Sequence, residues 1–289
     1  MKDIKELLKL LLVIALMIFS GLIVKTILSF FGYVYTDGDY FLYSIIDILA
    51  SLLIVLILVI IHRKTLKEDF KKIIKDKDGL LKYLGWIVIG YIFLLNIEFI
   101  CSFIERFIAF IFSINMDTPD NQAKVEVIIH SSPIIMAISA CLLAPLEEEL
   151  LFRGSIRKTI KNKGVFIAVS GLFFGLLHIT DNYILLIMII LLGFIISKLI
   201  SSNNKHKVLL SVMTTVIFIA LFMVSMFIVH GSIITYIYSI DPNEILNGIT
   251  YVCLGCYFAA IYAYTDNIYY TIGIHMITNT LASILILLK

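Results

Sequence analysis

Long apolar runs alternate with short polar links along the whole chain. Most of these runs contain the roughly 20 apolar residues that a helix needs to cross the hydrocarbon core of a bilayer. The nine runs are Leu10–Phe31, Phe41–His62, Tyr83–Phe103, Val127–Phe152, Val165–His178, Tyr183–Ile200, Val208–Ile240, Ile245–Tyr264 and Ile268–Leu288. The pattern predicts an all-α fold, a polytopic transmembrane helical bundle with about eight or nine membrane helices.

The end of the third run allows two predictions. Glu105 and Arg106 follow it, and a further apolar segment then continues from Phe107 to Ile114. This segment is predicted either as the end of one long tilted helix or as a separate interfacial helix.

Composition supports a membrane protein and excludes an ordinary soluble domain. Of 289 residues, 61% are hydrophobic and only 15% are charged, and the mean hydropathy is +1.02. A net charge of +2 is too small to indicate nucleic-acid binding. All four cysteines lie in apolar runs and are interpreted as packing residues. Cys253 and Cys256 form a C-x-x-C without a second pair, which does not predict a metal or redox site.

Basic residues concentrate in alternate links. The basic links are Arg63–Lys82, Arg153–Lys163 and Lys198–Lys207, and the acidic links contain Asp37, Asp117, Asp181 and Asp241. Because basic links usually face the cytoplasm, this pattern predicts an integral membrane protein with a cytoplasmic amino terminus. The short links and the composition rich in Ile and Lys favour a bacterial plasma membrane.

Three carboxylates and an arginine stand close together in A-P-L-E-E-E-L-L-F-R-G, residues 144–154. A charge in an apolar segment costs several kcal/mol unless it is paired or used. Glu149 and Arg153 are four residues apart and are predicted to pair on one helix face, so that Glu148 points elsewhere as a candidate general base. The alternative is a charge cluster at the membrane edge. Glu147 has no predicted role.

His178 is a second polar residue within an apolar helix. Glu148 lies 14 residues before Asn162, and His178 lies 14 residues after Gly164. A helical hairpin that turns between these positions brings His178 to the depth of Glu148, provided that the fourth helix continues past Arg153. The alternative role for a single histidine in a membrane helix is a structural hydrogen bond.

Two further pairs have helical spacing. Gly171 and Gly175 form a G-x-x-x-G, which predicts close packing of the helix that carries them. His275 and Asn279 lie on one face of the last helix, where two hydrogen-bond donors suit an oxyanion or a polar contact between helices. The remaining histidines are interpreted as nonfunctional: His62, His130, His206 and His230.

These motifs, taken in order, resemble the CPBP family of intramembrane proteases, also called Abi. The motifs are E-E-x-x-x-R beginning at Glu148, F-x-x-x-H beginning at Phe174, and H-x-x-x-N beginning at His275. The family contains the CaaX prenyl endopeptidases and the bacteriocin-processing and bacteriocin-immunity proteins. The resemblance covers about Pro133–Asp181 and Ile245–Ser283.

The resemblance also implies a division of the chain. Residues 126–289 would form a CPBP-like protease core that follows N-terminal transmembrane helices at 1–125. The segment 183–240 departs from the family pattern and is interpreted as an insertion of two helices. An even number of inserted spans preserves the orientation of the helix that carries the third motif.

The function implied by the resemblance is hydrolysis of a peptide bond in a membrane-associated peptide or protein, within the lipid bilayer and without nucleic acid. The implied catalytic residues are Glu148, His178, His275 and Asn279, and the implied supporting residues are Glu149, Arg153 and Phe174. Glu148, as the base, would activate a water molecule together with His178. His275 and Asn279 would hold the oxyanion, while Glu149 and Arg153 would orient Glu148.

No cofactor is needed for this chemistry. Zinc is an alternative, since the family was first described as metalloproteases, and its ligands would be Glu148, His178 and His275. The sequence has no H-E-x-x-H pair, and an asparagine such as Asn279 is a poor zinc ligand, so the metal-free scheme is preferred.

Two other classes of function remain open. One is a catalytically silent membrane scaffold, or a bacteriocin-immunity or regulatory protein of the same family. The other is a transporter or channel, in which Asp47, Glu98 and Arg106 would extend a polar path. Clustering of the motif residues at one depth favours a peptidase over a path across the bilayer.

Overall fold

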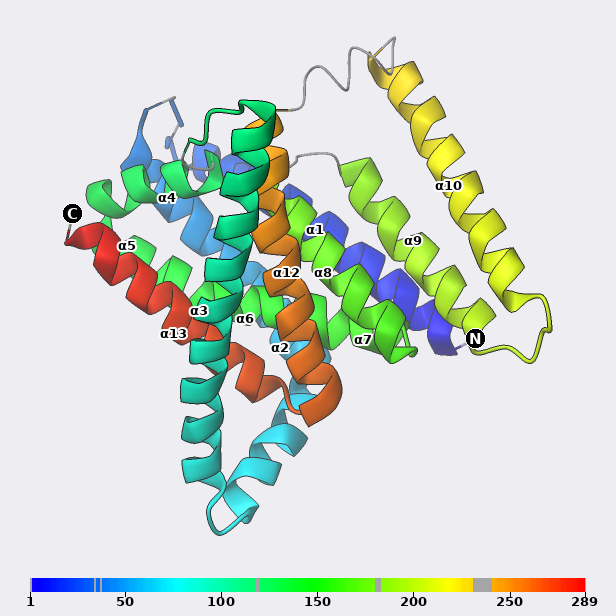
Figure 1. Ribbon diagram of the computed structural model, residues 1–289. Coiled ribbons are helices and arrows are strands. Elements are labelled where there is room, and N and C mark those ends of the chain that lie inside the picture. Colours follow the sequence, from blue (N-terminus) through cyan, green and yellow to red (C-terminus); the bar gives the residue numbers. More distant parts are fainter. Residues whose placement is uncertain are drawn as a thin grey trace. The chain divides into compact units, whose positions relative to one another are not determined.

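The computed structural model describes residues 2–33, 35–36, 38–117, 120–179, 183–230 and 241–288, and every regular element in these ranges is a helix (Figure 1). Among them, seven helices are long and apolar enough to cross a membrane by length and composition. These are α1 (Lys2–Phe30), α2 (Tyr40–Lys75), α3 (Gly79–Phe112), α9 (Tyr183–Ile200), α10 (Lys207–His230), α12 (Pro242–Thr265) and α13 (Ile268–Leu287). The predicted polytopic helical bundle is confirmed. The predicted links at Asp37 and Asp181, and residues 231–240 of the seventh run, lie outside the described ranges.

The third run forms a single helix. Because α3 extends without a break to Phe112, the alternative of a separate interfacial helix after Arg106 is wrong. The two remaining predicted spans are also helical. One is α8 (Lys163–Ile179), which is apolar but has only 17 residues. The other is interrupted and contains α4 (Asp120–Ser131), α5 (Pro133–Ile138), η1 (Ser139–Leu143), α6 (Ala144–Glu148), η2 (Glu149–Ser155) and α7 (Ile156–Thr159).

The interrupted span contains two π-helical turns, η1 and η2, which the sequence pattern did not predict. Proline removes a backbone donor and its ring crowds the preceding turn, so the wide turn of η1 directly before Pro145 has a local cause. The predicted end of this helix at Phe152 is too early. Helical structure continues through η2 and α7 to Thr159, as the hairpin prediction required.

The helices form two compact units that interleave along the chain. Unit 1 contains Met1–Phe93, Gln122–Ser155 and Tyr264–Lys289, and unit 2 contains Leu94–Asn121 and Ile156–Ala263. Both units contain segments from either side of residue 125. The division at that position and the insertion at 183–240 therefore stay predictions.

In unit 1, α2 is the helix that touches most of the other elements. It packs along α1 through a cluster of Val24, Leu42, Ile46 and Ala50. Its other neighbours are α5, η1, α6, η2 and α13. The elements that carry the first and third motifs therefore share one supporting helix.

In unit 2, α8 and α12 approach so closely that their glycines are needed. A Cβ added at Gly171 would lie 2.9 Å from the backbone nitrogen of Cys256, and one at Gly175 would lie 2.8 Å from that of Val252. Gly255 of α12 faces Gly171 in return, with 2.9 Å from its added Cβ to the Gly171 carbonyl oxygen. The close packing predicted from G-x-x-x-G is present, and α12 is the partner. Within the same unit, α9 and α10 run side by side as an antiparallel hairpin (Figure 1).

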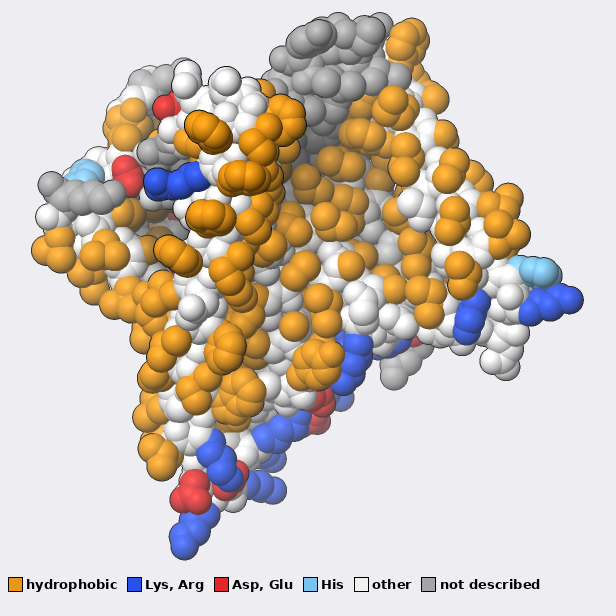
Figure 2. Space-filling model, viewed as in Figure 1, with side chains coloured by type: hydrophobic (Ala, Val, Ile, Leu, Met, Phe, Trp, Pro, Cys, Tyr) orange, Lys and Arg blue, Asp and Glu red, His pale blue; other side chains and the backbone are white. Residues whose placement is uncertain are grey.

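The surface agrees with a lipid environment. Figure 2 shows large hydrophobic side chains over the long helices, and none of the most apolar window of α10 is buried. Lys and Arg side chains gather at the α2–α3 turn, where Lys82 pairs with Asp76 at 2.6 Å. The hydrogen bond from Lys82 holds the pKa of the Asp76 carboxyl below its usual value. The cytoplasmic location of this turn stays a prediction.

Candidate active site

A fully buried ion pair in η2 forms the centre of the candidate site. Glu149 and Arg153 are both 0% exposed, and Nε of Arg153 lies 3.2 Å from Oε2 of Glu149. The guanidinium group also lies 5.6 Å from the centre of the Phe152 ring. The predicted pairing at four-residue spacing is therefore present, and each charge compensates for the other in an apolar interior.

His275 of α13 lies beside both motif glutamates. Its Nδ1 is 2.9 Å from Oε1 of Glu149, and its Nε2 is 3.8 Å from Oε2 of Glu148. An ionised carboxylate only accepts hydrogen bonds, so Nδ1 carries the proton and donates to Glu149, leaving Nε2 on the side of Glu148. The sequence predicted a pair formed by Glu149 and Arg153, but not this third partner.

Glu148 differs from Glu149 in its surroundings. Its side chain is 23% exposed, and its buried Oε2 has no hydrogen-bond partner among the residues that the structure describes. Both oxygens of Glu149, by contrast, face a charged or hydrogen-bonded neighbour. Of these two carboxylates, Glu148 is the more exposed and the less closely paired, since its nearest charged neighbour is Nε2 of His275 at 3.8 Å.

The side-chain amide of Asn279 donates to the backbone carbonyl of Ala140, which has no donor within its own helix. In η1 the N–H of Ala144 donates to the carbonyl of Ser139, five residues back. Pro145 has no N–H, so the carbonyl of Ala140 lacks the equivalent donor. Nδ2 of Asn279 supplies it at 2.9 Å. One N–H of the amide thus anchors α13 to η1, and the amide carries a second N–H.

Sequence reasoning missed the contribution of α2 to this site. Oδ2 of Asp47 accepts a hydrogen bond from Oγ of Ser139 at 2.6 Å, so this carboxylate of α2 holds η1. His62 is fully buried, and its Nε2 lies 2.8 Å from Oγ of Ser155. A Cβ at Gly154 would come within 2.8 Å of the His62 ring. His62, interpreted from sequence as nonfunctional, therefore packs directly on η2.

The spacing of Asp47 and His62 along α2 is the sequence signal that could have identified them. Positions 47 and 62 are 15 residues apart, close to four helical turns, which places both side chains on one face of α2. Two polar residues on one face of an apolar helix predict a polar neighbour along that face. Of the other histidines, His130 and His206 are exposed, and the side chain of His230 lies outside the described residues.

His178 belongs to unit 2, where two aromatic rings hold it. Its Nδ1 lies 2.7 Å from the carbonyl oxygen of Phe174, which can only accept, so the proton is on Nδ1 and Nε2 has the lone pair in the neutral ring. The centre of the His178 ring lies 4.5 Å from that of the Phe174 ring and 4.6 Å from that of the Tyr251 ring. The planes of the His178 and Tyr251 rings are 20° apart, so these two rings are stacked. Tyr251 was not predicted from the sequence. This geometry fixes the orientation and tautomer of the imidazole.

The structure therefore joins four of the seven predicted site residues by direct contacts and anchors a fifth, Asn279, to Ala140 of η1; all five belong to unit 1. They are Glu148, Glu149, Arg153, His275 and Asn279. Phe174 and His178 form their own arrangement in unit 2. The approach of His178 to Glu148 stays a prediction.

Comparison with known proteins places this chain in a family. Residues 130–205 match the family described as type II CAAX prenyl endopeptidase Rce1-like. The Bacillus subtilis (strain 168) protein named "Putative membrane peptidase YdiL" is 29% identical over 181 residues, which cover 59% of this chain and 70% of that protein. The Lactococcus lactis subsp. lactis (strain IL1403) protein named "UPF0177 protein YxdF" is 31% identical over 135 residues, 47% of this chain and 72% of that protein. The chain belongs to the CPBP family.

The CPBP match contains the first two motifs. Residues 130–205 include Glu148, Glu149 and Arg153 as well as Phe174 and His178, whereas His275 and Asn279 lie beyond the matched residues. No solved structure matches this CPBP chain. The contacts that join His275 and Asn279 to the first motif therefore come from the geometry of unit 1 alone.

The preference for a metal-free site stays a prediction. Among the described residues, no group of three or more His, Cys, Asp or Glu side chains could hold a metal ion. We therefore derive no chemical step through a metal.

Proposed function

We propose that this protein is a CAAX-protease-like intramembrane endopeptidase, which hydrolyses a peptide bond of a membrane-associated peptide or protein with a water molecule activated by Glu148 and His178. The observation that carries the proposal is Oε2 of Glu148, which has no hydrogen-bond partner among the described residues although it lies within a buried cluster of paired charges. Such an oxygen is where a general base would receive a proton.

In the proposed reaction, Glu148 takes a proton from water as the water oxygen attacks the carbonyl carbon of the substrate. His178 would orient the water by accepting a hydrogen bond from its second O–H through Nε2, the nitrogen left with a lone pair by the bond from Nδ1 to Phe174. The carbonyl electrons move onto oxygen, which becomes an oxyanion. When the C–N bond breaks, Glu148 returns its proton to the leaving amine.

Two donors would stabilise the oxyanion. Asn279 would use its second amide N–H, since the first is bonded to Ala140. Donation from Nε2 of His275 requires the doubly protonated ring, because Nδ1 already donates to Glu149. Arg153 would act indirectly, by holding Glu149 in the position that receives His275.

Hydrolysis can be tested with the purified protein in liposomes. We expect incubation with the membrane peptide fraction of the host, in water enriched in 18O, to yield peptides with 18O in new carboxyl termini. Mass spectrometry would identify them. The control is His178→Ala at equal protein level, which should yield none. Identical labelled peptides from both proteins would contradict the proposal, and no labelled peptides from either would favour the catalytically silent scaffold.

Metal removal is expected to leave cleavage unchanged. The proposed base, water and oxyanion donors are all supplied without an ion, and the described residues present no metal-binding group. The measurement is the cleavage rate after dialysis against a strong chelator, with metal content checked by mass spectrometry and with zinc added back. A loss on chelation that zinc restores would replace the metal-free scheme.

A further inference from the structure

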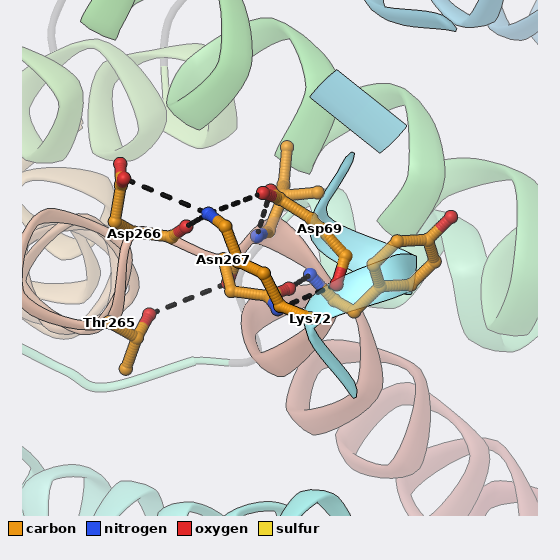
Figure 3. Close-up of polar contacts among 7 residues, drawn as sticks. Asp69, Lys72, Thr265, Asp266 and Asn267 are labelled. Carbon is orange, nitrogen blue, oxygen red and sulfur yellow. Dashed lines mark hydrogen bonds and ion pairs between the residues drawn. The ribbon is translucent and has the colours of Figure 1, made fainter. Parts of the chain in front are cut away.

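A cluster of polar contacts, here called the Asp69 clasp, joins the end of α2 to the start of α13 (Figure 3). It consists of Asp69, Lys72, Asp266, Asn267 and Ile268. Oδ2 of Asp69 accepts a hydrogen bond from the N–H of Ile268 at 3.1 Å, and Oδ1 accepts one from Nζ of Lys72 at 2.9 Å. The carbonyl oxygen of Asp69 also accepts from Nδ2 of Asn267 at 3.0 Å. Asp69 is only 3% exposed.

The clasp satisfies the first turn of α13 from outside the helix. Ile268 is its first residue, and the N–H groups of a first turn have no partner within the helix. Asp69 accepts a hydrogen bond from the N–H of Ile268, and Oδ1 of Asn267 accepts one from the N–H of Tyr269 at 3.0 Å. A carboxylate at this end also complements the helix dipole. Lys72 extends the clasp to the carbonyl oxygen of Asp266 at 2.7 Å.

The helix α2 also supports η1 and η2, the elements on either side of Glu148. α2 holds η1 through Asp47 and η2 through His62, and the Asp69 clasp lies further along α2. His275 follows Ile268 by seven residues, about two turns or roughly 10 Å of helix. The distance of 2.9 Å between His275 and Glu149 therefore depends on how α2 places both α13 and η2.

We propose that Asp69 is a positioning residue, which fixes the first turn of α13 so that His275 lies against Glu149. Asp69 itself lies outside the reacting groups and acts through the N–H of Ile268. This inference rests on the proposed peptidase function, and it adds a requirement at a distance from the motifs.

Three variants in liposomes test the proposal. Asp69→Ala removes the acceptor, Asp69→Asn keeps an acceptor oxygen but loses the charge, and Glu68→Gln removes a charge from the exposed neighbouring position as the control. We expect kcat to fall about tenfold or more in Asp69→Ala, because small misplacements of catalytic groups cost rates of this order. Asp69→Asn should lose less, and Glu68→Gln should keep the wild-type kcat. KM should change little in all three, since substrate contacts are unaltered.

A second measurement reports on His275 without any need for activity. Modification of His275 by diethyl pyrocarbonate, followed by mass spectrometry, should become severalfold faster in both Asp69 variants and stay unchanged in Glu68→Gln, because the ring is only 5% exposed in the intact site. If Asp69→Ala does not accumulate, Asp69→Asn is compared with Glu68→Gln instead. The criteria stay the fall in kcat and the rate of His275 modification.

The outcomes separate the two proposals. Wild-type kcat in Asp69→Ala, or an equal loss in Glu68→Gln, would overturn the positioning role. If the wild-type protein cleaves nothing, the proposed function fails, and the modification rate still decides whether Asp69 places His275. An unchanged rate in the Asp69 variants would overturn the inference in that case.

Discussion

Replacing Glu148 with glutamine is expected to lower the cleavage rate by about two to four orders of magnitude, the usual contribution of a general base. Glutamine keeps the shape of the side chain but cannot take a proton from water. The side chain of Glu148 is partly exposed, and its Oε2 has no hydrogen-bond partner among the described residues, with Nε2 of His275 at 3.8 Å. The measurement is kcat/KM for one identified peptide, with the amount of folded protein checked in each preparation.

The matched control is Glu147→Gln, the same substitution one residue earlier. Neighbouring residues on a helix point about 100° apart, so Glu147 and Glu148 cannot serve the same water. Glu147 instead has Ser51 of α2 as a hydrogen-bonding neighbour. We expect a far smaller loss in Glu147→Gln, and equal losses in the two variants would assign the effect to the helix as a whole.

Arg153→Met is expected to destabilise the protein by about 3–5 kcal/mol, the cost of leaving one partner of a buried ion pair without the other. Glu149 and Arg153 are both 0% exposed, so water cannot replace the lost charge. Denaturation in mixed micelles, followed by circular dichroism, measures the change. Arg63→Met, at an exposed position, is the control and should change stability little.

A double variant tests whether the pair acts as a unit. Glu149→Gln combined with Arg153→Met removes both charges, and it should be less destabilised than the sum of the two single changes. Additive losses would show that the two side chains contribute separately. The pairing seen between Glu149 and Arg153 would then not explain the stability of η2.

Local spacing in the sequence predicted the features that depend on one helix or on adjacent helices. The apolar runs predicted the spans, the four-residue interval predicted the pair of Glu149 and Arg153, and G-x-x-x-G predicted the close contact of α8. Glu149 and Arg153 are about one helical turn apart, so their contact follows from the sequence of one helix. The glycines of G-x-x-x-G leave the backbone open to close packing, whichever helix is the neighbour.

The features that were missed depend on contacts between distant parts of the chain. Glu149 and His275 are 126 positions apart, and no local pattern indicates that they meet. His62 was interpreted as nonfunctional, yet the absence of a side chain at Gly154 lets the His62 ring pack on η2. The π turn η1 has the same origin, since it combines the donor missing at Pro145 with a partner on α13.

The buried ion pair of Glu149 and Arg153 has a consequence for the charge of the site in the proposed reaction. Their opposite charges cancel, so the net charge of the E-E-x-x-x-R motif is the single negative charge of Glu148. When Glu148 accepts a proton from water, that negative charge moves to the substrate oxygen, and the total does not change. In a medium of low dielectric constant, moving a charge over a short distance costs much less than creating a new one. On the proposed mechanism, the buried pair would thus let hydrolysis proceed within the membrane without the creation of a new charge.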